Sequence, residues 1–469
     1  MRSVLYWAIQ RRWLLIAFLS GAFFLLLPLP AGLTPHGRQA LVIALVTMIL
    51  FVTEPVPLPA IALSIPVLQV LFGIDSPADV AHSFMNDSVF FILGSLMLAV
   101  GIVKQKVDRR LAVVIFRVTG PKVRHIVFGL IAVSAFLASL IGEHTVAAIM
   151  MPVVMSLIVH SSDGEHASPR LAALLLFSVA YSCAIAGVGT PSGGARNAIM
   201  IEYWSRLFDR RVSYLDWILY AYPMVILQAP MLALILLWRF KPEKADLSHA
   251  IRKLRAQVLW EGKMSGRDWL AVSIFGLTLF MWVSLSGRIG LGAPALIGVC
   301  LFLITGLVEW EDLNAGVNWG VFLIYASTIS LGTAIDATGA ASYVAGWFMR
   351  IASTVGLSSG AGLLAAVALL TVGVSSFISR APALGILTPI VLAMALDTGT
   401  NVLAMGFTTA MASAFTYMTI IGSPANTIIF SSGRLQTRDY LRAGVWMTLA
   451  SLVLLLLCSE TYWRVILPH

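Results

Sequence analysis

Residues 142–152 read GEHTVAAIMMP, and residues 379–389 read SRAPALGILTP. Each stretch ends in a proline ten residues after its first residue, and each follows an apolar segment dotted with serine. Both read as the tip and second arm of an apolar hairpin, one in each half of the chain. Each tip carries a charged side chain, Glu143 in the first and Arg380 in the second.

The resemblance between the two halves extends to both sides of the hairpins. Downstream, GVGTPSGGARNAIM (187–200) matches IIGSPANTIIF (420–430), and upstream, FILGSLMLAVGIV (91–103) matches FLIYASTISLGTA (322–334). Counting the crossings between them, we expect the halves to enter the membrane from opposite sides. Such an inverted repeat is typical of secondary transporters.

Clusters of glycine, serine and proline interrupt one apolar helix in each half, at 189–194 and 422–424. Broken backbone at membrane depth is tolerated only where protein or a wet cavity satisfies its polar groups. Helix starts exposed in this way attract anions. Two breaks at matching places therefore predict a binding site near the bilayer midplane.

The composition indicates that the solvent of this chain is lipid. Of its 469 residues, 59% are hydrophobic and only 11% are charged, with a mean hydropathy of +0.90. Soluble domains carry about 25% charged residues. Charge-free runs predict an all-α polytopic protein with about eleven transmembrane helices plus two re-entrant hairpins. The first run is too long for a signal peptide and lacks a small-residue cleavage site, so we expect it to be kept.

The net charge of +9 is concentrated in loops. The polar linker 239–268 is rich in Lys and Arg, and basic loops stay cytoplasmic. The N-terminus is also expected in the cytoplasm, because it carries Arg2, Arg11 and Arg12. We expect a multi-pass protein of the inner (plasma) membrane. No soluble basic domain is apparent, so nucleic-acid binding is not expected. The cysteines stand alone in apolar helices and suggest neither a metal site nor a disulfide framework: Cys183, Cys300 and Cys458.

Several stretches resemble the divalent anion/sodium symporter family, whose members carry dicarboxylates, tricarboxylates or sulfate. Beside the two hairpins they are TEPVPLPAIAL (53–63), FFILGSLMLAVGIVKQKVDRRLA (90–112), IGSPAN (421–426) and SSGRLQTRDYLRAGVWM (431–447). The resemblance covers nearly the whole chain after residue 40. It implies a homodimer, a scaffold domain, a transport domain built from two hairpins and two broken helices, and elevator-type alternating access.

The resemblance and the repeats together predict the following division of the chain. An N-terminal helix (1–36) precedes a first repeat (37–238), which holds an inner hairpin (about 124–160) and a broken helix (about 171–206). The basic linker (239–268) leads to a second repeat (269–469), with an outer hairpin (about 359–397) and a second broken helix (about 401–430).

In the family, the hairpin tips carry Ser-Asn-Thr and the broken helices carry Thr-Pro-Pro-Asn, which hold the substrate carboxylates and two sodium ions. Here the tips read Gly142-Glu143-His144 and Ser379-Arg380-Ala381, and the broken helices read Gly194-Ala195-Arg196-Asn197 and Ser423-Pro424-Ala425-Asn426. Both tip asparagines have become charged residues of opposite sign. This departure argues against the usual two sodium sites.

A charged side chain at the bilayer centre costs about 2.5–3.5 kcal/mol by insertion scales. The tips should approach each other, so Glu143 and Arg380 can act as counter-ions. We hypothesise that Arg380 takes the place of a sodium ion and binds an anion through its planar guanidinium. Glu143 would then take up a proton as the anion binds, whereas a fixed arginine alone would suit an exchanger. Arg196 would add a second positive charge for binding a dianion. The alternative is that Glu143 and Arg380 form an inert ion pair that only ties the two tips together.

Other side chains of the hairpins and broken helices are candidate ligands. His144 is a candidate proton shuttle or substrate donor, or else a polar neighbour of Glu143. The chain has no His-Glu-x-x-His spacing, which argues against a zinc site. We expect no cofactor, sodium being the one open case. Hydroxyl and amide candidates, each of which can also be a helix-packing group, are Thr145, Thr190, Ser192, Asn197, Ser376, Ser379, Ser423 and Asn426.

The sequence therefore predicts a secondary active transporter of small di- or tricarboxylate or sulfate-like anions, not an enzyme. It would be proton-coupled or exchanging and would work by an elevator mechanism. A zwitterion or sulfonate carrier and a sodium-coupled dicarboxylate symporter are alternatives. Arg380 argues against a cation antiporter, and an intramembrane enzyme would lack a nucleophile. A receptor is disfavoured because no soluble domain is present to signal.

Overall fold

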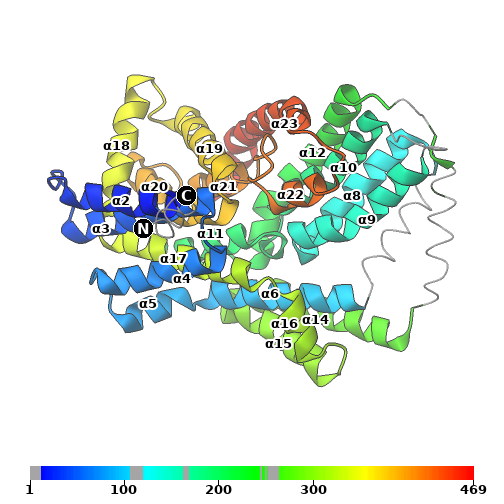
Figure 1. The fold of residues 1–469 in the computed structure, drawn as a ribbon, viewed down its shortest axis with the longest axis horizontal. Helices are drawn as coiled ribbons and strands as arrows, with labels where there is room; N and C mark the ends of the chain where they lie inside the picture. The colour runs from blue at the N-terminus through cyan, green and yellow to red at the C-terminus, as the bar shows by residue number, and fades with distance from the viewer. Residues whose placement is uncertain are drawn as a thin grey trace, which may run out of the picture.

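The structure, a computed structural model, describes residues 12–105, 120–161, 168–242, 246–248, 251 and 264–468 (Figure 1). These residues are helical apart from turns and short links, and their one isolated β-bridge joins Lys122 to Asp246. Much of the basic linker, with Lys244, Arg252, Lys253, Arg255 and Lys263, lies outside them, as do Arg2 and Arg11.

The helices of the first half run in the following order: α2 (Arg12–Leu26), α3 (Pro35–Thr53), α4 (Leu58–Leu71), α5 (Pro77–Phe84), α6 (Asp87–Lys104), α8 (Val123–Ile141), α9 (Glu143–His160), α10 (Pro169–Ala186), the 3-10 turn η1 (Pro191–Gly193), α11 (Ala195–Phe208) and α12 (Tyr214–Arg239).

The second half continues with α14 (Gly266–Ile289), α15 (Gly292–Ile304), α16 (Trp310–Gly316), α17 (Trp319–Ala337), α18 (Ala340–Thr354), α19 (Gly360–Phe377), α20 (Arg380–Thr398), α21 (Val402–Ala412), α22 (Pro424–Phe430), α23 (Thr437–Cys458), the π-helical turn η2 (Ser459–Trp463) and α24 (Arg464–Ile466).

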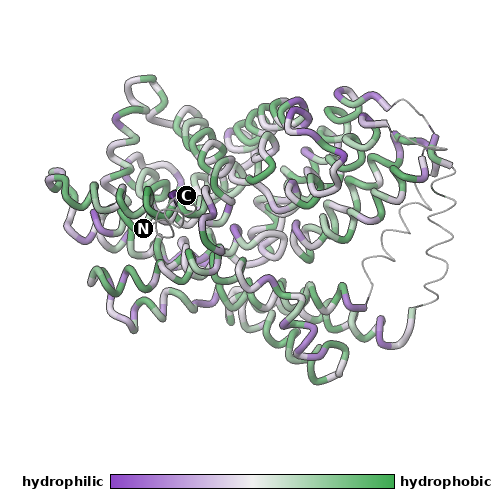
Figure 2. Tube along the Cα trace, in the orientation of Figure 1, coloured by the Kyte–Doolittle hydropathy of each residue, from purple (hydrophilic) through white to green (hydrophobic). Residues whose placement is uncertain are grey.

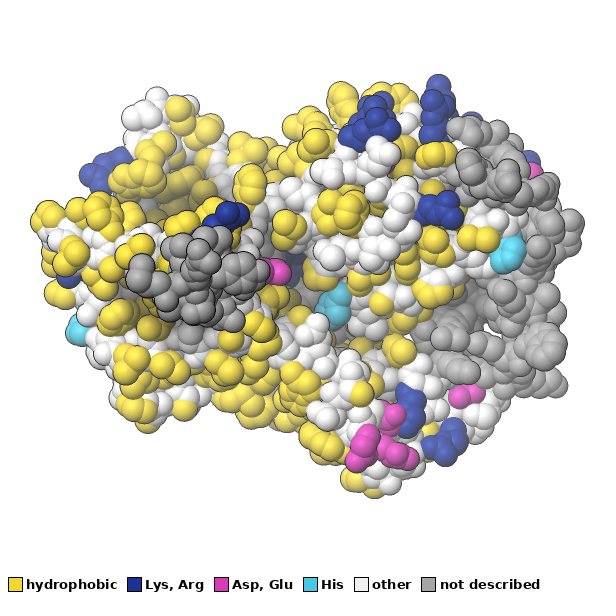
Figure 3. Space-filling view, viewed as in Figure 1, with side chains coloured by type: hydrophobic (Ala, Val, Ile, Leu, Met, Phe, Trp, Pro, Cys, Tyr) yellow, Lys and Arg dark blue, Asp and Glu magenta, His cyan; other side chains and the backbone are white. Residues whose placement is uncertain are grey.

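Eleven helices of the described chain are long and apolar enough to cross a membrane. This confirms the expected all-helical membrane protein and the count of about eleven. The eleven include α8, α9, α19 and α20, the helices in the two predicted hairpin segments. Hydrophobic residues predominate along most helices in Figure 2, and hydrophobic side chains cover much of the face in Figure 3. Such a surface suits contact with lipid rather than with water.

Sharp turns join the helix pairs α8–α9 and α19–α20. The first turn is a single residue, Gly142, whose φ of 88° lies in the region that favours glycine. The second turn is the extended pair Ile378 and Ser379. In both cases the charged tip residue, Glu143 or Arg380, becomes the first residue of the returning helix.

The broken helix of each half packs against the hairpin of the other half. In the first half α10 ends at Ala186, and the chain passes through η1 before α11 begins at Ala195. In the second half α21 ends at Ala412 and α22 begins at Pro424. Helix α11 packs against α20, and α22 packs against α9. Each broken helix therefore brings its second part to the hairpin of the other half. Figure 1 shows α11 and α22 near the middle of the molecule, with α20 to the left and α9 to the right.

Helix α17 joins this centre to the rest of the protein by packing against both α4 and α20. Two glycines make the approach of α17 to α20 possible. A Cβ on Gly332 would overlap the Tyr203 hydroxyl and the Gly385 carbonyl oxygen, and a Cβ on Gly385 would lie 2.6 Å from the Cβ of Thr328. The contact therefore requires residues without side chains on both helices.

Candidate functional site

Glu143 lies at the start of α9 and is buried. Each of its carboxylate oxygens accepts a hydrogen bond from a different arginine. Arg196 Nη1 donates to Oε1 at 2.9 Å, and Arg380 Nη1 donates to Oε2. We call Arg196, Glu143 and Arg380 the charged triad. Its members are distant in sequence, and all three are less than 6% exposed.

Arg196 is the second residue of α11, directly after the break in its helix. Besides Glu143, it reaches the Ala184 carbonyl oxygen, with Nη2 at 3.4 Å. Glycines make room for its guanidinium group. A Cβ on Gly187 would lie 2.8 Å from Arg196 Nη2, and a Cβ on Gly194 would lie 3.2 Å from Arg196 Cζ. The glycines of the break between α10 and α11 therefore leave the space that the Arg196 guanidinium group occupies.

Arg380 is held from the other side, by the unwound segment between α21 and α22. Its Nε and Nη2 donate to Thr416 Oγ1 at 3.2 and 3.1 Å, and Nη2 also donates to the Ala414 carbonyl oxygen at 3.2 Å. Thr416 in turn donates to the Gly422 carbonyl oxygen at 3.1 Å. These bonds fix the guanidinium group by acceptors other than Glu143.

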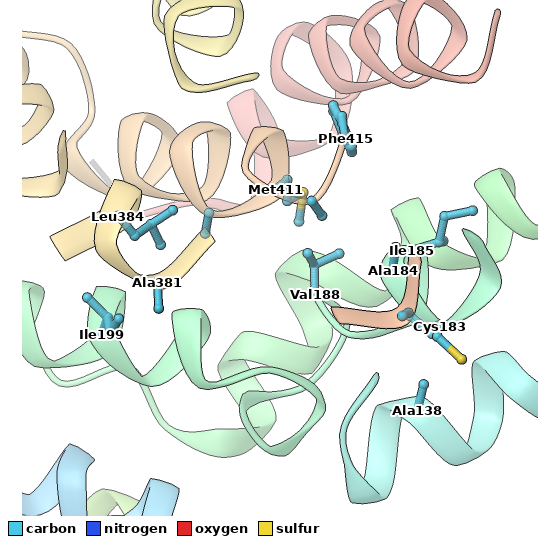
Figure 4. Close-up of a cluster of buried hydrophobic side chains, with 14 of the residues drawn as sticks. Ala138, Cys183, Ala184, Ile185, Val188, Ile199, Ala381, Leu384, Met411 and Phe415 are labelled. Carbon is cyan, nitrogen blue, oxygen red and sulfur yellow. The ribbon is translucent and has the colours of Figure 1, made fainter. Parts of the chain in front are cut away.

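Buried hydrophobic residues adjoin the triad: Ala381 follows Arg380 in α20, and Arg196 reaches the Ala184 carbonyl oxygen. Figure 4 shows Ala138 of α8, Cys183 and Ala184 of α10, Ala381 of α20 and Met411 of α21 gathered in one region. All five side chains are buried. Charges interact strongly in such surroundings, and an unpaired charge there is expensive.

The triad carries two positive charges and one negative charge, so it is net positive when all three groups are ionised. Two guanidinium groups that face one carboxylate form a receptor for a planar or tetrahedral oxyanion, because guanidinium matches carboxylate and phosphate-like geometry. Chemically, the arrangement can hold an anion in place of Glu143. It offers no nucleophile activated by a base.

Asn197 and Asn426 occupy matching positions with matching bonds. Asn197 Nδ2 donates to the carbonyl oxygens of Gly187 and Thr190, both at 2.7 Å. Asn426 Nδ2 donates to those of Thr416 and Thr419, at 3.2 and 2.8 Å. In each half the acceptors lie ten and seven residues before the asparagine. The two amides therefore fasten the unwound segments, and the Oδ1 atom of each is buried with no hydrogen-bond partner among the described residues.

A cavity of about 30 Å³ lies beside the first hairpin tip. Its lining includes Gly142, His144, Ser192, Ser95 of α6 and Tyr325 of α17. Within the part of the chain that the structure describes, His144 Nε2 and Ser95 Oγ are buried without a hydrogen-bond partner. The cavity has room for one or two water molecules and places unused polar atoms next to Glu143.

The hydroxyl candidates fall into two groups. Thr190 and Ser192 both donate to the Ser139 carbonyl oxygen, and Ser376 donates to that of Val372 within its own helix. These three have structural partners. Ser423 is buried with an unpartnered Oγ among the described atoms, whereas the half-buried Thr145 and Ser379 lie beside the charged tips.

Sequence reasoning missed Thr416, the main anchor of Arg380, and Ser95 at the cavity. A signal for Thr416 exists in the repeats, because it lies ten residues before Asn426, as Gly187 lies ten residues before Asn197. Ser95 has no such signal in its own segment. The described residues contain no group of three or more His, Cys, Asp or Glu placed to hold a metal ion.

Comparison with known proteins adds independent findings. A model of the family described as "Sodium:sulfate symporter transmembrane region" matches residues 8–468. The sodium-dependent dicarboxylate transporter SdcS of Staphylococcus saprophyticus is 23% identical over 466 residues, covering 92% of this chain and 87% of the relative. Its counterpart in Staphylococcus aureus is 25% identical over 474 residues, covering 94% and 90%.

Among solved structures, the YdaH transporter of Alcanivorax borkumensis is similar, with a TM-score of 0.53 over 85% of this chain and 88% of that one. At 13% identity, this likeness concerns the fold alone.

Proposed function

This chain belongs to the sodium:sulfate symporter family and is a secondary transporter, and from that premise we propose that it carries small anions bound by Arg196 and Arg380. The substrates would be dicarboxylates, tricarboxylates or sulfate-like oxyanions. The observation that carries the proposal is the buried carboxylate of Glu143, which already bridges the two guanidinium groups. A site that holds one carboxylate in this way suits the carboxylate or sulfate group of a solute.

In this proposal, the positive charge that balances the bound anion comes from Arg380 and Arg196 and not from sodium ions. Arg380 stands where the resemblance places an asparagine of the family's hairpin tip, and Arg196 stands in the first broken helix. Two fixed guanidinium groups can neutralise a dianion with no bound cation, so transport would not use the usual two sodium ions. Coupling would come from proton uptake, with Glu143 and His144 as the sites, or from exchange of one anion for another.

Other parts of the prediction belong to the same proposal. The α8–α9 and α19–α20 hairpins, with the broken helices, would form a transport domain that moves as an elevator against a scaffold that includes α4 and α17. The close glycine contact between α17 and α20 would then lie at the moving interface. We expect a homodimer in the inner membrane with its N-terminus in the cytoplasm.

A sodium-coupled dicarboxylate symporter is the second candidate. The printed names of the Staphylococcus relatives favour it, since both are sodium-dependent dicarboxylate transporters. A zwitterion or sulfonate carrier is a further alternative, in which Arg380 takes the acid group and Glu143 takes an amine.

Transport into proteoliposomes tests the proposal. We expect the wild type to take up labelled succinate, citrate or sulfate. The same assay with Arg380→Ala and Arg196→Ala should show at least about a tenfold loss, as expected when a charge-assisted hydrogen-bonding partner worth 1.5–3 kcal/mol is removed. Asp397→Asn, an exposed change at the far end of α20, is the matched control. Undiminished transport by both arginine variants would eliminate the proposed site.

A further inference from the structure

We propose that Glu143 is a tethered occupant of the anion site, whose carboxylate takes the substrate's place between Arg196 and Arg380 when the carrier is empty. This inference rests on the proposed function and adds a role for Glu143. The residue would compete with the substrate and neutralise the arginines on the empty return, which allows net transport instead of strict exchange.

The bonding pattern of the triad supports this role. Glu143 Oε1 accepts from Arg196 and Oε2 accepts from Arg380, so one carboxylate spans both guanidinium groups as a ligand would. Both arginines have further anchors, at Ala184 for Arg196 and at Thr416 for Arg380. Glu143 accepts from these two arginines and from no other described donor. Arg380 is therefore held by several acceptors other than Glu143, Arg196 has one further bond of 3.4 Å, and Glu143 has only the two arginines as described partners.

The position of Glu143 permits it to leave. It follows Gly142, at the sharp turn of the hairpin, and it lies at the very start of α9. The cavity of about 30 Å³ is lined by both of its chain neighbours, Gly142 and His144. That space has room for one or two water molecules beside the hairpin tip. His144 Nε2 and Ser95 Oγ, both buried and unpartnered among the described residues, line this cavity and can receive the displaced carboxylate.

The electrostatics explain why an occupant is needed. Without any anion, two guanidinium groups would remain unpaired in the buried interior of the protein. Buried charges without partners are strongly unfavourable at membrane depth. An empty carrier of that kind could move only when loaded and would be an obligate exchanger. With Glu143 between the arginines, the empty site has its own counter-charge and can reorient.

Glu143→Gln in proteoliposomes separates the two modes of transport, because glutamine keeps the shape and removes the charge. We expect the wild type to show both anion exchange and net uptake of labelled succinate, citrate or sulfate. In the variant, net uptake should fall about a hundredfold relative to exchange, the ratio given by 2.5–3.5 kcal/mol for an uncompensated charge. Asp397→Asn should retain both modes.

Several results would overturn the inference. They are net uptake by Glu143→Gln at the wild-type rate, loss of exchange in a folded Glu143→Gln protein, or a wild type that exchanges but shows no net uptake. A wild type that exchanges none of the three anions would instead count against the proposed function itself.

If Glu143→Gln does not fold, Glu143→Ala purified in acetate keeps the inference testable. Acetate should fill the vacated place between the arginines and raise the melting temperature of Glu143→Ala much more than that of the wild type. Equal shifts in both proteins would contradict the inference.

Discussion

Three charged residues, Glu143, Arg196 and Arg380, are buried together at the candidate site. Glu143 bonds to Arg196 and Arg380 in the buried interior, where pairing decides whether a charge is tolerated. The sequence marked all three residues, and the alignment of the two hairpins predicted that Glu143 and Arg380 would be neighbours. It did not predict that Arg196 shares the same carboxylate, because nothing in the spacing of residues 143 and 196 shows how a broken helix returns to a hairpin tip.

Removing one member of the triad should cost far more than removing all three. Glu143→Leu leaves two unpaired buried arginines, and we expect the free energy of unfolding to fall by about 3–5 kcal/mol. The triple variant Glu143→Leu, Arg196→Met, Arg380→Met replaces the charges by apolar groups and should recover most of that loss. Denaturant unfolding in detergent micelles measures both. A triple variant less stable than the single one would show that the triad itself stabilises the fold.

At the scale of structural elements, the two unwound segments are held by the same pattern of asparagine hydrogen bonds. Asn197 and Asn426 each donate to two carbonyl groups, ten and seven residues back along the chain. The sequence aligned these asparagines and predicted the hairpins and the breaks. It could not assign Thr190 and Ser192 to structural bonds with Ser139, because a hydroxyl on an apolar helix looks the same whether it binds a ligand or a carbonyl group.

Because their bonds match, the two asparagines should be equally sensitive to substitution. Asn197→Ala removes the side-chain donor to Gly187 and Thr190, of which Thr190 still accepts from the Gly193 N–H, and Asn426→Ala removes the donor to Thr416 and Thr419. We expect each to lower the free energy of unfolding by about 1–3 kcal/mol. Asn314→Ala, an exposed position in α16, should change stability by less than about 0.5 kcal/mol. An effect confined to one of the two asparagines would argue against equivalent roles in the two halves.

The contact between α17 and α20 gives a prediction about packing. Gly332→Ala would drive a methyl group into the Tyr203 hydroxyl and the Gly385 carbonyl oxygen. We expect a loss of about 1–3 kcal/mol from overpacking. Gly276→Ala in α14, where a Cβ meets no atom within 4 Å, should be neutral or stabilise the helix by about 1 kcal/mol. Equal stability of the two variants in thermal unfolding would show that α17 and α20 have room to separate.

At the scale of the whole molecule, composition alone predicted a helical membrane protein, and matching segments predicted how the halves correspond. Helix α11 of the first half packs on α20 of the second, and α22 of the second half packs on α9 of the first. These contacts bring both hairpins and both broken helices together. Sequence could predict this meeting only through the family resemblance. The size of the cavity and the position of Ser95 depend on side-chain packing between distant helices, which no local pattern encodes.

A carrier whose positive charges are arginines should not need sodium. We expect uptake of labelled anion by proteoliposomes in sodium buffer to equal uptake in choline buffer. The expected equality follows from the two guanidinium groups, which supply charge at the site under either condition. Uptake that requires sodium would favour the second candidate, a sodium-coupled dicarboxylate symporter.

The most direct test of the central claim, that Arg196 and Arg380 bind the transported anion, is an experimental structure of the protein with that anion bound. We predict anion oxygens within hydrogen-bond distance of both guanidinium groups, with the Glu143 carboxylate turned away from them. An anion seated elsewhere, with Glu143 still bridging the two arginines, would contradict the claim.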